Sequence, residues 1–249
     1  MESSSFYTTC PSNASMSIYP DNTQASFKIN LPKRLYLQNK YEVALVEIQY
    51  PVSWLTLGRN EAIEIMYGTR LETIQVKPMM YNTIEEVLYF LMSSIMKRSS
   101  KMNYKARAVS INEFKGGIIH YVLEDDCKMR MTQGLADVLG FTPNAWITGS
   151  GESMYPPDIR RGLNSMYVYC NVVDSQIVGD VYAPLLRTVA VRGQRNQVIS
   201  QTFEKPHYVS VNTDEVSTIE INIKDDTGEN ISFQSGKVIC KLHFRQKAI

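Results

Sequence analysis

The chain has 249 residues, enough to bury a large core in one all-β domain or in two small domains, without disulfide or metal staples. Its 26 basic and 25 acidic residues give a net charge of +1, which argues against a protein that grips a nucleic-acid backbone over its whole surface. The four cysteines, Cys10, Cys127, Cys170 and Cys240, form no C-x-x-C pair. This scatter is typical of reduced thiols and not of a disulfide framework.

The N-terminal segment, residues 1–14, is rich in Ser and Thr and shows no periodic apolar pattern. We therefore predict a flexible arm at 1–14 and a single domain over 15–249. The arm has no apolar core of a secretory signal and no Lys or Arg, so neither secretion nor direct nucleic-acid binding is expected. No apolar stretch is long enough to span a bilayer, so no membrane partner is expected.

Alternating apolar residues predict many strands along the chain. Phe27, Ile29 and Leu31 alternate before Pro32, and Tyr41–Ile48 is strand-like until Pro51 ends the run. Turn residues separate many of the segments, as in a β-sandwich. The other predicted strands are Ser15–Tyr19, Ile63–Tyr67, Leu71–Val76, Lys105–Ile111, Ile118–Leu123, Met166–Val173, Leu185–Val191 and Tyr208–Val211.

Two helices interrupt the strands. Thr83 and Glu86 form a capping box, and a helical stripe of apolar residues follows until Lys97 and Arg98 in the last turn. A second, short helix is predicted over Thr132–Leu139, with Gly140 as its C-terminal cap. Packing on a sheet is the preferred role for the first helix. We predict one domain with helical insertions.

The C-terminal segment has the clearest period of two. Ile219, Ile221 and Ile223 fall on one face of a strand, and Val238, Cys240, Leu242 and Phe244 repeat the pattern after a turn. The chain therefore ends inside an antiparallel sheet with one buried face, which indicates a β-sandwich or a barrel.

The turn contains Asp226-Thr227-Gly228, the triplet of aspartic proteases. Charged and polar residues flank it and no second triplet occurs, so only a homodimer could pair two carboxylates. A solvated hairpin tip is the preferred interpretation. His120, His207 and His243 are far apart in the sequence, and Cys170 and Cys240 lie in apolar strand patterns. We therefore expect no enzyme, no cofactor and no metal site.

Several segments resemble the minor capsid (penton) proteins of Polinton/Maverick elements and adintovirus-like viruses. They include M-Y-V-Y-C-N-V-V-D-S-Q-I-V-G-D at Met166–Asp180, A-P-L-L-R at Ala183–Arg187 and L-A-D-V-L-G-F at Leu135–Phe141. Y-P-D-N-T-Q-A-S-F-K-I-N-L-P at Tyr19–Pro32 and the two C-terminal runs are similar too. These motifs cover most of the chain, but none is a catalytic signature.

The resemblance implies a single jelly-roll β-sandwich of two four-stranded antiparallel sheets with one or two helical insertions. It implies a homopentamer at the fivefold vertices of an icosahedral capsid, beside trimers of a double-jelly-roll major capsid protein. The expected location is the virion capsid, after synthesis in the host cytoplasm, with the nucleus as an open alternative for assembly.

Subunit contacts are expected around large aromatic residues in loop-like context, namely Trp54, Trp146 and Tyr155. Two other functions stay open. One is a cellular-type jelly-roll interaction module, trimeric cytokine-like or lectin-like, against which the lack of a secretory signal counts. The other is an aspartic protease that uses Asp226.

Overall fold

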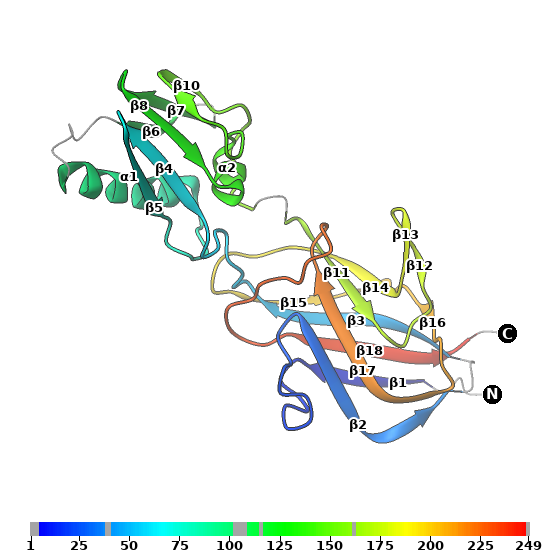
Figure 1. Cartoon of the computed structure of the whole chain (residues 1–249). Coiled ribbons are helices and arrows are strands. Elements are labelled where there is room, and N and C mark those ends of the chain that lie inside the picture. Colours follow the sequence, from blue (N-terminus) through cyan, green and yellow to red (C-terminus); the bar gives the residue numbers. More distant parts are fainter. Residues whose placement is uncertain (1–4, 38–40, 102–108, 115–116, 161–162, 248–249) are drawn as a thin grey trace. The chain divides into compact units, whose positions relative to one another are not determined.

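The computed structural model describes residues 5–37, 41–101, 109–114, 117–160 and 163–247. Antiparallel strands dominate, as the sequence predicted. Contacts divide the chain into two compact units, Met1–Trp54 with Leu163–Ile249, and Leu55–Gly162. We call the first the jelly-roll unit and the second the inserted unit (Figure 1). The sequence pattern predicted one domain over 15–249, because no repetitive polar linker marks either end of the insertion.

Eight principal strands of the jelly-roll unit form two four-stranded sheets. One sheet has the order β1-β18-β3-β15 and the other the order β14-β11-β17-β2, with every pair antiparallel. If these eight strands are numbered 1 to 8 in chain order, the two sheets have the orders 1-8-3-6 and 5-4-7-2. The chain therefore crosses repeatedly from one sheet to the other, as in a jelly roll. The strands are β1 (Ser5–Pro11), β2 (Ser26–Tyr36), β3 (Tyr41–Pro51), β11 (Ser165–Cys170), β14 (Leu185–Ala190), β15 (Val198–Thr202), β17 (Glu215–Lys224) and β18 (Ile239–Gln246).

The predicted alternation in the C-terminal strands is confirmed. Ile219, Ile221 and Ile223 on β17 are fully buried, as are Leu242 and Phe244 on β18. Residues between them on each strand are more exposed. Short strands complete this unit: β16 (Val209–Ser210) pairs with β3, and β12 (Gln176–Val178) pairs with β13 (Val181–Ala183).

The N-terminus differs from the sequence prediction. Residues 5–11 of the expected arm form β1, which pairs with β18 from Ser5 opposite Arg245 to Pro11 opposite Ile239. Cys10 on this strand is fully buried. The apolar alternation of β1 is hard to recognise in the sequence, because the large Tyr7 side chain faces outward. Thr8 and Cys10 take two of the inward positions. The predicted strand Ser15–Tyr19 is wrong, since these residues form hydrogen-bonded turns.

The inserted unit has its own two sheets and both helices. One sheet has the order β5-β4-β8-β9 and the other β10-β7-β6. A core cluster that includes Ile63, Leu91, Ile119 and Leu135 joins sheets and helices. The elements are β4 (Ala62–Tyr67), β5 (Arg70–Gln75), α1 (Ile84–Lys101), β6 (Val109–Phe114), β7 (Ile118–Leu123), β8 (Cys127–Met131), α2 (Gln133–Leu139), β9 (Ile147–Thr148) and β10 (Ser150–Glu152).

The helix caps agree with the sequence in part. The Thr83 hydroxyl accepts the Glu86 N–H at 3.3 Å, while the Glu86 carboxylate accepts the Asn82 N–H at 2.9 Å. At α2 the Thr132 side chain makes no cap hydrogen bond; the Glu61 carboxylate accepts the Leu135 N–H at 3.0 Å instead. Glu61, which lies just before β4 and is distant in the sequence, therefore caps α2. Most of the predicted strand Lys105–Ile111 lies outside the described residues, and β6 begins at Val109.

We predict that Gly140→Ala destabilises the inserted unit much more than Gly149→Ala. Both glycines have left-handed backbones, with φ of 76° and 65°, which cost a side chain about 1–2 kcal/mol. A Cβ on Gly140 would also lie 1.9 Å from the Tyr155 carbonyl oxygen, whereas Gly149 has nothing within 4 Å. The clash adds about 1–3 kcal/mol. Urea unfolding checks this difference, and equal losses for the two variants would contradict it.

Candidate assembly surfaces

Trp54 belongs to the jelly-roll unit and packs within its own chain. It forms an isolated antiparallel bridge with Phe233, and the two rings meet edge to face with centroids 6.1 Å apart. Its side chain is half-buried. Phe233 of the same chain therefore covers part of the Trp54 side chain, and only the remaining part is open to a partner subunit.

Trp146 belongs to the inserted unit, just before β9, and is half-buried. Two cations from β8 lie over its ring: the Lys128 ammonium 4.9 Å and the Arg130 guanidinium 4.7 Å from the centroid. Arg130 is also paired with Glu64 at 2.5 Å. These contacts fix the indole on the strand surface.

Hydrogen bonds hold the backbone of Tyr155, whereas its ring is exposed. Its N–H donates to the Gly140 carbonyl at 3.0 Å, and its carbonyl accepts the Ser153 hydroxyl at 2.9 Å. The side chain is 61% exposed. Of the three predicted contact residues, Tyr155 alone has an exposed ring on a fixed backbone.

The β12–β13 hairpin is a surface that the contact prediction missed. Ile177, Val181 and Tyr182 are exposed by 71%, 55% and 76%, and Ile177 lies directly opposite Tyr182. Gly179, with φ of 63°, makes the tight turn. An isolated two-stranded hairpin is at best marginally stable in water. The sequence signal for this hairpin is the Gly179-Asp180 turn, which lies between two short apolar pairs.

The outer face of the first jelly-roll sheet carries a stack of aromatic rings and cations. The Tyr7 and His243 rings stack with centroids 4.4 Å apart, and the Tyr208 hydroxyl hydrogen-bonds with His243 Nδ1 at 2.7 Å. The Arg245 guanidinium lies 3.4 Å over Tyr208 and is paired with Glu42 at 2.6 Å. His243 lies on the polar face of β18, as the sequence predicted.

We predict that His243 makes the protein less stable below pH 6.5. Burial, and then the nearby Arg245 charge, lower the pKa of His243 from 6.5. Between that lowered value and 6.5 the unfolded chain takes up a proton that the folded chain does not, so the stability present above pH 6.5 is lost as the pH falls. His243→Gln should therefore lose less stability between pH 7 and pH 5 than the wild type, in urea unfolding at both pH values. Equal losses would show that His243 does not contribute.

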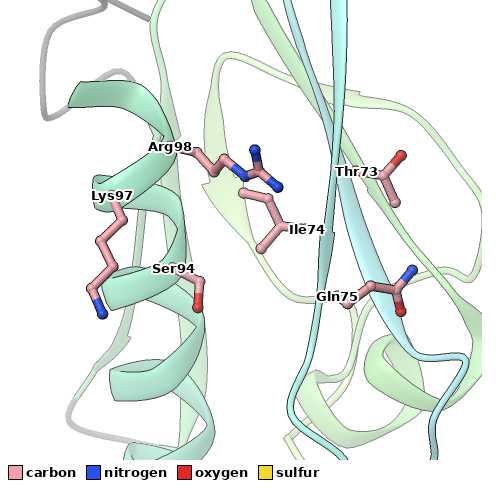
Figure 2. A pocket seen from close by; sticks show the side chains of 6 residues that line it. All are labelled: Thr73, Ile74, Gln75, Ser94, Lys97 and Arg98. Carbon is pink, nitrogen blue, oxygen red and sulfur yellow. The ribbon is translucent and has the colours of Figure 1, made fainter. Parts of the chain in front are cut away.

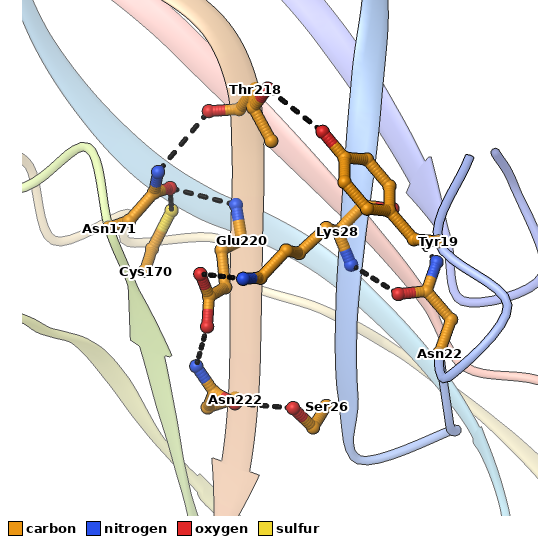
Figure 3. A network of polar contacts seen from close by, with 9 residues as sticks. All are labelled: Tyr19, Asn22, Ser26, Lys28, Cys170, Asn171, Thr218, Glu220 and Asn222. Carbon is orange, nitrogen blue, oxygen red and sulfur yellow. Dashed lines mark hydrogen bonds and ion pairs between the residues drawn. The ribbon is translucent and has the colours of Figure 1, made fainter.

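A polar network covers part of the second sheet (Figure 3). The Asn171 amide donates to the Thr218 carbonyl at 3.2 Å, and its oxygen accepts the Glu220 N–H at 2.8 Å. The Glu220 carboxylate pairs with Lys28 at 3.4 Å and accepts a hydrogen bond from Asn222 at 3.2 Å. The network joins the end of β11 to β17 and β2. Its groups satisfy one another, which indicates a structural role.

The Asp226 triplet lies at an exposed turn. The Asp225 carboxylate accepts hydrogen bonds from the Thr227 N–H at 2.9 Å and the Glu229 N–H at 3.0 Å, and Gly228 has φ of 86°. Asp226 itself is exposed, with polar neighbours. This geometry is that of a hairpin tip, whereas a protease dyad needs a buried triplet.

The cysteines are poor nucleophiles. Burial raises the pKa of Cys10 and of Cys170 to about 12, and that of Cys240 well above its usual value. These thiols are therefore protonated near neutral pH. Within the described residues, no three His, Cys, Asp or Glu side chains are grouped to hold a metal ion. Over the same part of the chain, no helix is long and apolar enough to cross a membrane.

The sheets and their strand order define the class of protein: an all-β protein with a jelly-roll fold and helical insertions. No protein-family model matches the sequence, and no curated protein matches it.

A solved structure has a fold similar to that of this chain over nearly its whole length. The crystal structure of the selenomethionine-labelled mavirus penton protein is similar to this chain with a TM-score of 0.52 and 11% sequence identity. The alignment covers 98% of this chain and 100% of the mavirus chain. The chain therefore has a virus-type, penton-like fold.

Proposed function

We propose that this chain is a minor capsid (penton) protein that forms homopentamers at the fivefold vertices of an icosahedral capsid. The source we infer is a Polinton/Maverick element or an adintovirus-like virus, because several segments resemble those proteins. The partner beside each pentamer is a double-jelly-roll major capsid protein, and the location is the virion capsid.

The main support is the extent of the structural likeness. The alignment with the mavirus penton protein includes both units of this chain and the whole of that protein. A shared sandwich alone would leave the inserted unit unmatched. The likeness in both parts favours a common role over a chance similarity between two jelly rolls.

The exposed hairpin β12–β13 gives further support. A ring subunit needs two different surfaces that join head to tail, and a cluster of solvent-exposed apolar side chains is typical of such a contact. Ile177, Val181 and Tyr182 form a cluster of this kind. Covering them with a neighbouring subunit would also stabilise a hairpin that is marginal alone.

The absolute mass of the purified protein, measured by light scattering over a concentration series, tests the proposal. We expect a species five times the 28.4 kDa subunit mass. A stable trimer would contradict the proposal and favour a cytokine-like module, and a stable dimer would contradict it too. A monomer that stays monomeric when the major capsid protein is added would also overturn it.

A further inference from the structure

A pocket of about 380 Å³ lies between β5 and α1 of the inserted unit (Figure 2). Its polar side chains do not converge, because Thr73 and Gln75 alternate onto the face of β5 that points away from the helix and only Ile74 faces it. We therefore assign no ligand to this pocket.

Three buried thiols, in contrast, lie together in the core of the jelly-roll unit. Cys10 on β1 and Cys240 on β18 are direct partners in the register of this strand pair, and both are fully buried. Cys170, at the end of β11 in the other sheet, is buried too and interacts electrostatically with both. The fourth cysteine, Cys127, belongs to the inserted unit. Folding thus gathers thiols that are far apart in the sequence.

The register places Cys10 and Cys240 at a separation that a disulfide can bridge. Directly opposite residues of an antiparallel pair have Cα atoms about 4.5–5.5 Å apart, within the range of about 4.4–6.8 Å found in disulfides. Their Cβ atoms lie on one face of the sheet about 4.5–5.5 Å apart, whereas a disulfide needs about 3.5–4.5 Å. The strands must therefore approach by up to about 1 Å, which strains the bond and makes it easier to reduce.

We propose that Cys10 and Cys240 are an oxidation site, at which a reversible disulfide ties β1 to β18. The oxidant is glutathione disulfide or another small disulfide. One protein thiol loses its proton and attacks a sulfur of the oxidant, which forms a mixed disulfide and releases one glutathione. The second protein thiolate then attacks the protein sulfur of the mixed disulfide and releases the second glutathione. Two protein thiols are oxidised, and the two glutathione thiols that leave take up their protons.

Access to the thiols depends on the opening of β1. Burial raises the pKa of Cys10 to about 12, so this thiol does not react while the strands are paired. β1 is the edge strand of its sheet, and among the described residues β18 is its one strand partner (Figure 1). β1 can therefore separate without breaking another strand pair, and this local opening exposes Cys10 and Cys240 together. The opening of β1 sets the rate of oxidation.

The site responds to the redox state of its surroundings. Glutathione keeps thiols reduced in the cytosol, whereas disulfides persist outside the cell. In a capsid protein the bond would be absent during assembly and would form in the released particle. That timing rests on the proposed function, whereas the bond itself rests on the strand register.

Thiol counting on the purified full chain tests the site. The protein is equilibrated with reduced or with oxidised glutathione and then unfolded with N-ethylmaleimide, so that its intact mass gives the number of free thiols. We expect four free thiols in the reduced protein and two in the oxidised protein, with a peptide that joins residues 10 and 240. The oxidised protein should unfold at least about 4 °C higher, because the bond closes a loop of nearly the whole chain. Excess reduced glutathione should restore all four thiols.

Cysteine variants identify the pair. Cys10→Ala and Cys240→Ala should each form no internal disulfide in oxidised glutathione. Cys127→Ala is the matched control and should form the bond as the wild type does, since Cys127 lies in the other unit.

Two variants that keep every thiol test the opening step. Phe6 stacks on Phe244 with ring centroids 5.0 Å apart, so Phe6→Ala weakens the attachment of β1. It should speed disulfide formation at least about tenfold. Thr9→Ala, at an exposed position of the same strand, should change the rate by less than about twofold.

Four free thiols after long equilibration with oxidised glutathione would overturn the proposal. A disulfide that includes Cys170 or joins two chains would overturn it as well. Equal rates for Phe6→Ala and Thr9→Ala would show that β1 does not open to admit the oxidant. Since none of these readouts depends on the oligomeric mass, the site and the proposed function can fail separately.

Discussion

Replacing both Ile177 and Tyr182 with serine is expected to convert the proposed pentamer into folded monomers, whose unfolding temperature is lower only by the stability that assembly contributed. Both side chains are more than two-thirds exposed in the single chain, so the monomer loses almost no packing. Burying each in a subunit contact would contribute about 1.5–3 kcal/mol. Loss of both corresponds to about a hundredfold or more in affinity at each contact. Light scattering of the variant, with thermal unfolding beside it, measures both effects.

A control variant removes apolar surface of the same kind elsewhere in the jelly-roll unit. Tyr36 and Val198 are also exposed, on β2 and β15, and neither belongs to the hairpin. Tyr36→Ser/Val198→Ser should stay pentameric if the hairpin is the contact. A hairpin variant that keeps the five-subunit mass would show that the subunits join through another surface.

Deleting residues 1–11 is expected to destabilise the jelly-roll unit by about 3 kcal/mol or more, from the lost burial of Phe6 and Cys10 alone. Phe6 stacks on Phe244 with ring centroids 5.0 Å apart, and Cys10 is fully buried opposite Cys240. The deletion also removes the strand that pairs with β18. For a chain of this size the unfolding temperature should fall by about 6–12 °C.

Thr9→Ala is the matched control, because Thr9 lies on the same strand with its side chain exposed. Its effect should stay within about 0.5 kcal/mol, as for most surface substitutions. Scanning calorimetry of the wild type and both variants makes the comparison. An unchanged unfolding temperature after the deletion would mean that the N-terminus is a dispensable arm and that β1 contributes nothing to stability.

The contrast between inward apolar and outward polar residues explains which strands the sequence predicted well. The β17 and β18 patterns were clear because every inward position carries an apolar residue and most outward positions a polar one. β1 lacks that contrast, and β12 and β13 have only three residues each, too few for a period to emerge. The sequence did not predict the N-terminal cap of α2, because Glu61, which supplies it, is far away in the sequence.

The sequence by itself determined the all-β class, the cap of α1, the left-handed cap at Gly140 and the hairpin tip around Asp226. Each of these depends on residues within one strand, one turn or one helix end, where local sterics and hydrogen bonds decide the conformation. The tertiary structure alone decided the strand order, the pairing of β1 with β18 and the division into two compact units. It also decided that Trp54 packs on Phe233. These depend on pairings between distant segments, and the free energy of such pairings comes from burial that no local pattern records.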